Sequence, residues 1–556
     1  MNKDIAAWWK TGTPWIWLTA AAVSASLVMV LGLLILTAYN GLGHFWPHAV
    51  WEFEYQAADG SGVQHLIGEI TDDEVTSVER MRHTGAQLPD DLGETLERFL
   101  LKTGNRDVSG LDFRWILGPL IVTRDKPHKL VVFERTEWGN FYGYIKNIKQ
   151  GGELVVEGDA AWHELQSRLV QVGKVRKQIH RIEKSEIGGV NYAIEQLRLD
   201  RRKLELDGRD TPERLAGLQR ERDALQAKFI ELQKELDAKY QEISGDSVTM
   251  TVMSGRDVNV PIANIVRAYR PNDMSLLQKV GFYASKIWEF VSDEPREANT
   301  EGGIFPAIFG TVAMVLLMSV VVTPFGVVAA VYLREYARQG PLTRLIRIAV
   351  NNLAGVPSIV YGVFGLGFFV YLLGGNIDRL FYPEALPAPT FGTPGLMWAS
   401  LTLALLTLPV VIVATEEGLT RIPSSIREGS LALGATKAET LWRTVLPMAS
   451  PAMMTGLILA VARAAGEVAP LMLVGVVKLA PSLPIDGNSP FVHLDRKFMH
   501  LGFHIYDVGF QSPNVEAARP LVYATALLLV LVILVLNLAA ISIRNRLRER
   551  YRELEQ

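Results

Sequence analysis

The sequence alternates between long uncharged apolar blocks and strongly charged stretches. A helix needs about 20 apolar residues to cross the hydrocarbon core of a bilayer. Five blocks of that length carry no charge, and a sixth is interrupted only by Arg463 and Glu467. The pattern therefore predicts an all-α polytopic membrane protein with six spans. The predicted spans are residues 15–39, 304–333, 348–377, 391–415, 448–477 and 521–543.

The first block is predicted to remain in the mature protein. Trp15 and Trp17 stand at its start, where indole rings favour the membrane interface. The block could be a signal peptide, but its apolar part far exceeds the about 7–15 residues of a signal-peptide core. We expect residues 1–39 to form a short N-terminal segment and an uncleaved first span.

Basic residues in the short loops predict the orientation, because Lys and Arg concentrate on the cytoplasmic side. They cluster after the second span, after the fourth span, in the C-terminal tail and, as Lys3 and Lys10, before the first span. Both termini are therefore expected in the cytoplasm of a bacterium, with residues 40–303 in the periplasm. The basic residues after the three spans include Arg334, Arg338, Arg344, Arg347, Arg421, Arg427, Lys437, Arg443, Arg544, Arg546, Arg548, Arg550 and Arg552.

The charged region between the first two spans is predicted to be an α+β insertion. Residues 40–159 contain short strand-like runs separated by turn signals. Residues 160–241 carry apolar positions at spacings of three, four and seven, which favours an antiparallel coiled-coil hairpin that turns near Gly208. Residues 246–300 read as a strand pair followed by an amphipathic helix near the outer surface. The hairpin could be a charged spacer or a docking or sensing element.

Composition excludes several classes of protein. The net charge is −3, so no basic excess favours nucleic-acid binding. The chain has no cysteine, which excludes a disulfide framework, a thiolate metal site and a cysteine nucleophile. We expect no metal and no cofactor.

The loop between the fourth and fifth predicted spans, residues 416–447, carries two capping patterns. Ser425 precedes Glu428 by three positions, and Thr436 precedes Glu439 by three. Gly434 lies between them, where a left-handed residue would end the first helix. With Pro447 closing the second helix, the pattern predicts a helix–turn–helix that is either an ordinary inter-span loop or a docking site for a partner. Its expected apolar surface comprises Leu431, Leu433, Ala435, Leu441 and Trp442.

This loop resembles the EAA loop of ABC importer permeases. Glu428, Gly434, Leu446 and Pro447 match that motif, whereas Gly429, Ser430 and Thr444 depart from it. Two further stretches, "LAGVPSIVYGVFGLGFF" at 353–369 and "ARAAGEVAPLMLVG" at 462–475, resemble the phosphate permease subunits PstA and PstC, and the "GEVAPLM" form favours PstA. The resemblance covers Phe305 to the C-terminus. The first span and the insertion look like an extended version of this subunit.

The resemblance implies a type I importer permease fold, with residues 304–556 as a five-span core. It implies a second permease subunit, two ATPase subunits and a periplasmic phosphate-binding protein as partners. The chain itself has no G-x-x-x-x-G-K-[ST] string, so ATP would be hydrolysed elsewhere and this chain is not expected to be an enzyme. The residues expected to couple to the ATPase are Glu428, Leu431, Leu433, Gly434, Ala435 and Thr436.

Arg463 and Glu467 lie four residues apart and are expected on one helix face. Arg463 would lie about 22 Å into its predicted span, and a charge at that depth costs at least about 2.5–3.5 kcal/mol. The pair could be a purely structural ion pair. Alternatively it could line an anion pathway, because a guanidinium matches the oxygens of phosphate bidentately. By resemblance, both residues match positions of the family's translocation pathway.

Ser358 and Tyr361 are secondary candidates for the same pathway. They follow Pro357, which removes a backbone donor and should interrupt the helix. The alternative is that the nearby small residues serve only tight helix packing.

These features together predict a permease that moves inorganic phosphate into the cytoplasm by alternating access, driven by a partner ATPase. Two other functions stay open. One is a permease for another oxyanion or solute, and the other is a membrane-anchored sensor.

Overall fold

A computed structural model of the chain describes residues 11–552, apart from 61, 86, 90–91 and 513–514. Within this part, six helices are long and apolar enough to cross a membrane, which agrees with the predicted number. Lys3 and Lys10, which contributed to the predicted orientation, lie outside the described residues. The six helical segments are Thr13–Gly43, Phe305–Tyr336, Ser358–Phe381, Leu396–Thr420, Lys437–Gly466 and Ala518–Arg546.

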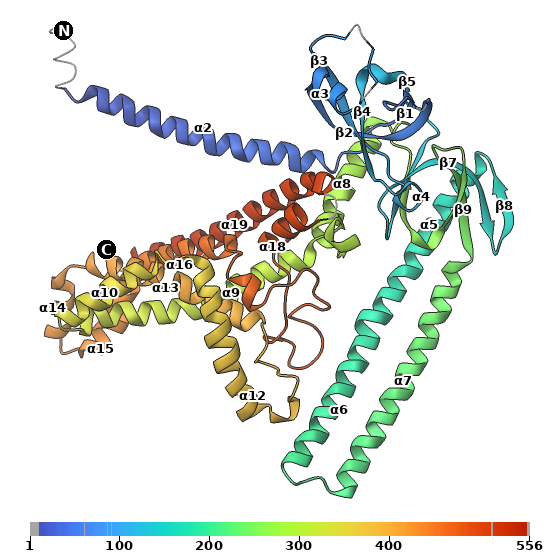
Figure 1. Cartoon of the computed structure of the whole chain (residues 1–556). Helices are drawn as coiled ribbons and strands as arrows, with labels where there is room; N and C mark the ends of the chain where they lie inside the picture. The colour runs from blue at the N-terminus through green and yellow to red at the C-terminus, as the bar shows by residue number, and fades with distance from the viewer. Residues whose placement is uncertain (1–10, 61, 86, 90–91, 513–514, 553–556) are drawn as a thin grey trace.

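Four of these segments form the core of a helical bundle (Figure 1). Helix α13 (Leu396–Thr420) lies at its centre and packs against α9 (Phe305–Val331) and α16 (Leu446–Gly466), while α16 also packs on α19 (Val515–Arg552). The helices approach closely because small residues lie between them. Gly456 is one example, since a Cβ added there would meet Ala414. By contrast, α2 (Thr13–Gly43) is almost fully exposed and contacts α19 near one end, as Figure 1 shows.

The third span begins later than the sequence predicts. Residues 341–353 form a separate amphipathic helix, α10 (Pro341–Leu353), and α11 (Ser358–Phe364) begins after Pro357. Proline lacks the backbone N–H of a helical hydrogen bond and disfavours helical geometry in the residue before it, which favours the break between the two helices. The span then continues through a π-helical stretch, Gly365–Gly374, into α12 (Gly375–Phe381).

The fifth span also differs from its predicted bounds. Helix α15 (Lys437–Thr440) continues through a π turn, Leu441–Val445, directly into α16. Glu467 leaves the helical conformation, with φ −83° and ψ 126°. Pro470 follows shortly afterwards and cannot donate to a continuing helix. The observed span, Lys437–Gly466, therefore begins and ends earlier in the chain than the predicted span 448–477.

The insertion between α2 and α9 contains two antiparallel sheets. One has five strands in the order β4-β3-β2-β1-β5, and the other has the path β10-β9-β7-β6-β11 with β8 paired to β7. Strands β6 and β7 lie among the strand-like runs predicted within residues 40–159, and the predicted strand pair after the hairpin has a third member, β11. The strands are β1 (Val50–Gln56), β2 (Val63–Ser77), β3 (Thr95–Lys102), β4 (Phe113–Leu117), β5 (Ile121–Asp125), β6 (Val131–Arg135), β7 (Phe141–Gln150), β8 (Glu153–Glu157), β9 (Asp246–Thr251), β10 (Asp257–Pro261) and β11 (Ile265–Tyr269). A short pair, β12 (Pro295–Arg296) and β13 (Glu301–Gly302), precedes α9, and two short helices, α3 (Val78–His83) and α4 (Arg106–Ser109), flank β3.

Two long helical arms leave the second sheet side by side (Figure 1). The first arm runs from α5 (Ala160–Arg181) through a π turn, Ile182–Ile187, into α6 (Gly188–Leu206). The second arm is α7 (Pro212–Ser244), whose 33 residues extend about 50 Å. The predicted turn at Gly208, with φ +65°, is confirmed. The π turn interrupts the regular α-helix of the first arm, and coiled-coil packing of the arms stays a prediction.

Helix α5 belongs to the core of the second sheet along most of its length. Leu165, Val172 and Ile179 are buried there together with Phe133 and Met250. The base of the hairpin is therefore part of the insertion's fold, whereas the distal half projects away from it (Figure 1).

Candidate functional site

Arg463 and Glu467 stand where α16 ends. Arg463 lies in the last turn of the helix, and Glu467 is the first residue outside it. The Arg463 Nε atom is 3.5 Å from Glu467 Oε1, so the predicted pairing is confirmed. The side chain of Arg463 is 33% exposed and that of Glu467 is 23% exposed, so both are half-buried.

The packing of α16 on α13 places the pair near the middle of the bundle. The two helices are antiparallel, and a Cβ on Gly456 would meet Ala414. Arg463 lies two turns further along α16 and so beside the middle of α13. Helix α16 therefore ends, at Gly466, inside the bundle rather than at its edge. A charge at such a depth is costly without a partner or water, and Glu467 supplies a partner.

The structure brings Tyr361 near this pair. Tyr361 is buried on α11, within electrostatic range of the Arg463 guanidinium. Its hydroxyl donates to the carbonyl of Leu353 at 2.6 Å and so ties the end of α10 to α11. Ser358 is the first residue of α11 and is half-buried. Tyr361 thus has a clear structural role at the helix break, and pathway roles for both residues stay predictions.

Close packing accounts for one of the glycines beside Tyr361. A Cβ on Gly362 would lie 2.6 Å from the Cα atom of Pro470. The segment that follows Glu467, including α17 (Leu471–Val474), can therefore pack directly on α11. The segment that follows α16 therefore packs on the start of the third span.

The second candidate region is the loop between α13 and α16, here called the capped loop (residues 416–447). Thr436 accepts from the backbone N–H of Glu439, whose carboxylate accepts from the backbone N–H of Thr436, so the second predicted capping box is confirmed. Gly434 has φ +88°, the left-handed geometry predicted for the turn. The first predicted box is wrong: α14 (Ser424–Ala432) has Pro423 at its N-cap, and Ser425 lies inside the helix.

The predicted apolar surface of the capped loop is mostly present. Leu433 is 91% exposed and Trp442 is 76% exposed, and Leu431 is also exposed. Leu441 is buried instead, in a small core with Leu419 and neighbouring residues. Pro447 does not close a helix as predicted, because the π turn carries the chain past it into α16.

Arg427 and Glu335 anchor the capped loop to α9, and the sequence analysis did not predict this contact. Arg427 contacts the Glu335 carboxylate at 2.9 Å and also donates to the backbone carbonyls of Ile422 and Leu419. Glu335 lies in the π turn Tyr332–Tyr336 that continues α9. The sequence shows Arg427 only as one of several basic residues in a loop, and no spacing links it to a carboxylate far away in the chain. This ion pair joins the capped loop to the end of α9.

Replacing Thr436 with alanine is expected to loosen the start of α15. Loss of a threonine N-cap costs about 0.5–2 kcal/mol. Hydrogen exchange of the amides in Lys437–Thr440 should therefore accelerate by roughly fivefold, as a change of about 1 kcal/mol implies. Thr436→Ser should restore most of the protection, and Thr420→Ala, at an exposed hydroxyl outside the box, should leave these amides unchanged. Equal exchange in Thr436→Ala and the parent chain would contradict the capping role.

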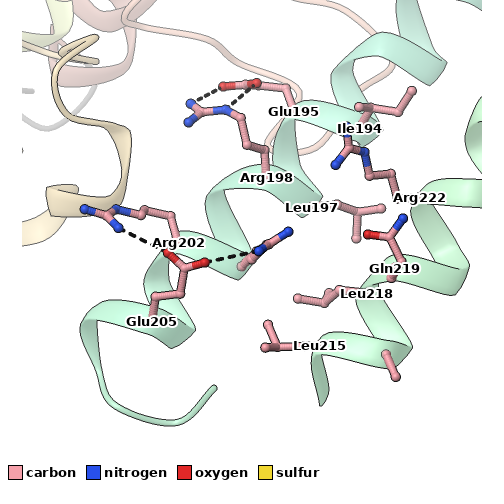
Figure 2. Close-up of a pocket in the computed structure, with 12 residues that line it drawn as sticks. Ile194, Glu195, Leu197, Arg198, Arg202, Glu205, Leu215, Leu218, Gln219 and Arg222 are labelled. Carbon is pink, nitrogen blue, oxygen red and sulfur yellow. Dashed lines mark hydrogen bonds and ion pairs between the residues drawn. The ribbon is translucent and has the colours of Figure 1, made fainter. Parts of the chain in front are cut away.

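A cavity of about 560 Å³ lies between the distal parts of α6 and α7. Figure 2 shows Leu197, Leu215 and Leu218 facing the space between the two helices. The arginines on α6 are already paired, Arg198 with Glu195 at 2.7 Å and Arg202 with Glu205 at 3.1 Å. The cavity is therefore lined by the paired arginines of α6 together with Arg222 of α7.

Comparison with known proteins identifies the family. Residues 322–553 match the family described as "Binding-protein-dependent transport system inner membrane component". The phosphate transport system permease protein PstA 1 of Mycobacterium tuberculosis is 34% identical over 244 residues, which cover 44% of this chain and 71% of that protein. This chain belongs to the family of ABC transporter permease subunits.

A second relative of the permease agrees. The phosphate transport system permease protein PstA of Mycobacterium leprae is 35% identical over 219 residues, covering 39% of this permease and 66% of the relative. A solved structure titled "Inward facing conformations of the MetNI methionine ABC transporter" is similar at 20% identity with a TM-score of 0.31, covering 43% of this permease and 94% of that chain. The two Mycobacterium relatives are phosphate transport system permease proteins, so the PstA-like resemblance is confirmed. The matched residues include α16 and the capped loop and leave out the insertion.

Proposed function

We propose that this permease subunit imports inorganic phosphate into the bacterial cytoplasm. The observation that carries the proposal is the half-buried Arg463 side chain, paired with Glu467 at the end of α16, in a chain related to phosphate permeases. A guanidinium stays charged at every physiological pH and offers a planar set of donors to an oxyanion. Glu467 would orient Arg463, balance its charge when the pathway is empty and accept a hydrogen bond from the protonated oxygen of phosphate.

Ser358 and Tyr361 would line the same pathway from α11. Tyr361 already uses its hydroxyl hydrogen on Leu353, so it would contribute chiefly an acceptor and a rigid wall. Ser358 would supply a hydroxyl at the start of the helix. The two breaks, before α11 and after α16, would place backbone polar groups along a cavity, where such groups are tolerated within a membrane.

The capped loop would couple this permease to ATP hydrolysis in separate subunits. Glu428, Leu431, Leu433, Gly434, Ala435 and Thr436 would form the surface that seats in the ATPase. An almost fully exposed leucine such as Leu433 favours a protein partner, since such a side chain gains by burial. Differential binding of the ATPase to two permease conformations would bias their equilibrium and give alternating access. The anchor from Arg427 to Glu335 would transmit the movement to α9.

The complete importer would contain a second permease subunit, two ATPase subunits and a periplasmic phosphate-binding protein. The permease would have the type I importer fold, with both termini in the cytoplasm and the insertion in the periplasm of the inner membrane. Basic residues near the capped loop and the C-terminus support this orientation.

Transport by the reconstituted importer tests the substrate. We expect labelled phosphate to accumulate in proteoliposomes that contain all subunits and ATP, and excess sulfate to compete poorly. Equal competition by sulfate would favour a permease for another oxyanion. The assay needs a matched complex with an inactive ATPase as its control.

Shortening the hairpin tests the alternative of a membrane-anchored sensor. Deleting residues 160–240 would remove part of the sheet core, because Leu165 and Val172 are buried there. Replacing only residues 198–221 with a short turn keeps that core intact. We expect phosphate uptake by this variant to stay within about twofold of the parent, since the removed surface is a solvated charged face. Complete loss of uptake in a correctly assembled complex would contradict an accessory role for the tip.

A further inference from the structure

Helix α8 (Leu276–Ser292) exposes a continuous apolar stripe outside the candidate spans. Leu277 is 86% exposed and Trp288 is 72% exposed, with Val280 and Ala284 exposed between them. Residues at these spacings share one face of a helix. A single exposed leucine would be unremarkable, whereas four apolar residues in a row form a surface that favours a partner.

The opposite face of α8 packs on the second sheet. The ring of Phe282 lies 4.6 Å from that of Tyr269 on β11. Lys286 pairs with Glu134 on β6 at 3.0 Å, and Glu289 pairs with Arg267 at 3.1 Å. The sheet therefore covers the face of α8 that is turned away from the apolar stripe.

A third face of α8, adjacent to the stripe, packs on the ends of two candidate spans. Phe290 contacts Phe45, just after α2, with ring centroids 4.9 Å apart, and Tyr283 contacts Trp46 at 5.7 Å. The backbone N–H of Ile304, just before α9, donates to the carbonyl of Phe290 at 2.8 Å. Helix α8 consequently sits at the level where α2 and α9 leave the bundle, and Figure 1 shows it between α2 and the sheets.

We propose that α8 is an interfacial helix whose stripe, Leu277–Val280–Ala284–Trp288, lies in the lipid leaflet on the side of the insertion. The stripe borders the ends of two membrane helices and points away from the sheet, so the lipid that surrounds α2 and α9 continues directly onto it. An amphipathic helix buries its apolar face at the boundary of headgroups and acyl chains, and tryptophan favours that depth. Since α8 is pinned to the sheet by its ion pairs, the membrane would hold the whole insertion against the bundle.

Lipid fits this stripe better than a protein partner does. Its residues are apolar along the full length, and the contacts of α8 with other parts of the chain lie on the remaining faces. The exposed side chains at its border, Gln278 and Ser285, are polar and would mark the boundary with water. A protein partner is the other outcome that the experiment distinguishes.

The absence of cysteine makes the test direct, since a single introduced cysteine carries the only spin label. We would place labels in the full chain in nanodiscs of phosphatidylethanolamine and phosphatidylglycerol with Leu277→Cys, Ala284→Cys or Trp288→Cys. Gln278→Cys and Ser285→Cys are matched controls on the same helix. Power saturation then compares the accessibility of each label to oxygen and to a water-soluble nickel chelate.

We expect the three stripe positions to show a several-fold higher ratio of oxygen to nickel accessibility than the two controls. Equal, water-like ratios at all five positions would overturn the proposal. So would stripe labels that are water-accessible in the lone chain and become immobilised only when the other importer subunits are added, because that result identifies a protein partner. The measurement uses neither phosphate nor ATP, so its failure is distinct from a failure of the proposed transport function.

Discussion

Replacing Arg463 with alanine is expected to lower phosphate uptake by about tenfold to a hundredfold. A hydrogen bond to a charged group is worth about 1.5–3 kcal/mol, and the loss of even one such bond in the pathway gives a reduction of this size. Arg463→Lys should also reduce uptake strongly, because an ammonium keeps the charge and loses the bidentate fork. Initial rates of phosphate uptake in proteoliposomes, normalised to assembled complex, measure both effects.

The matched control for Arg463 is Leu459, one helical turn earlier on α16. Leu459 is exposed like Arg463 and carries no charge, and Leu459→Ala should leave uptake nearly unchanged. A double substitution separates the pathway role from a structural ion pair. If the pair served only structure, Arg463→Ala combined with Glu467→Ala should restore uptake, since no charge would remain unpaired. The pathway role predicts that the double variant stays as inactive as Arg463→Ala alone.

Replacing Leu433 with aspartate is expected to weaken association with the ATPase at least about tenfold. Burying a leucine side chain is worth about 1.5–3 kcal/mol, and an aspartate at the same place adds the cost of removing a charge from water. Leu433 is the most suitable site because it is almost fully exposed and Gly434 follows it at φ +88°. Co-purification and the affinity of the ATPase for the permease in detergent measure the effect.

Two further variants define this second prediction. Gly434→Ala should weaken association less than Leu433→Asp, because an alanine in left-handed geometry costs about 1–2 kcal/mol. Leu479→Asp is the matched control, since Leu479 is an exposed leucine after α17, in the segment that follows α16 rather than in the capped loop. Unchanged ATPase association in Leu433→Asp would refute the proposed docking surface.

The predictable features were those that depend on local sequence. Six apolar blocks predicted six membrane helices, and the capping box at Thr436 and the left-handed turn at Gly434 followed from residues a few positions apart. The four-residue spacing of Arg463 and Glu467 likewise predicted their pairing. Each of these features is determined within one or two helical turns.

The features that the sequence could not predict depend on contacts between distant segments. Nothing near Arg427 indicates that Glu335, on another span, receives its guanidinium. The third span was predicted too long because hydropathy does not distinguish the end of α10 from the start of α11 across Pro357. The first capping box was wrong although Ser425 and Glu428 have the required spacing. The helix begins at Ser424, so Ser425 is not its N-cap. Hydropathy and spacing alone do not decide between such alternatives.

The central claim is that the Arg463 guanidinium meets the transported anion. A cryo-EM structure of the assembled importer, trapped with phosphate between its gates, tests this claim most directly. The account predicts density for an oxyanion within hydrogen-bond distance of the Arg463 nitrogens, in a cavity continuous with water on one side of the membrane. A guanidinium that faces lipid, or that is enclosed by protein with the anion bound elsewhere, would contradict it.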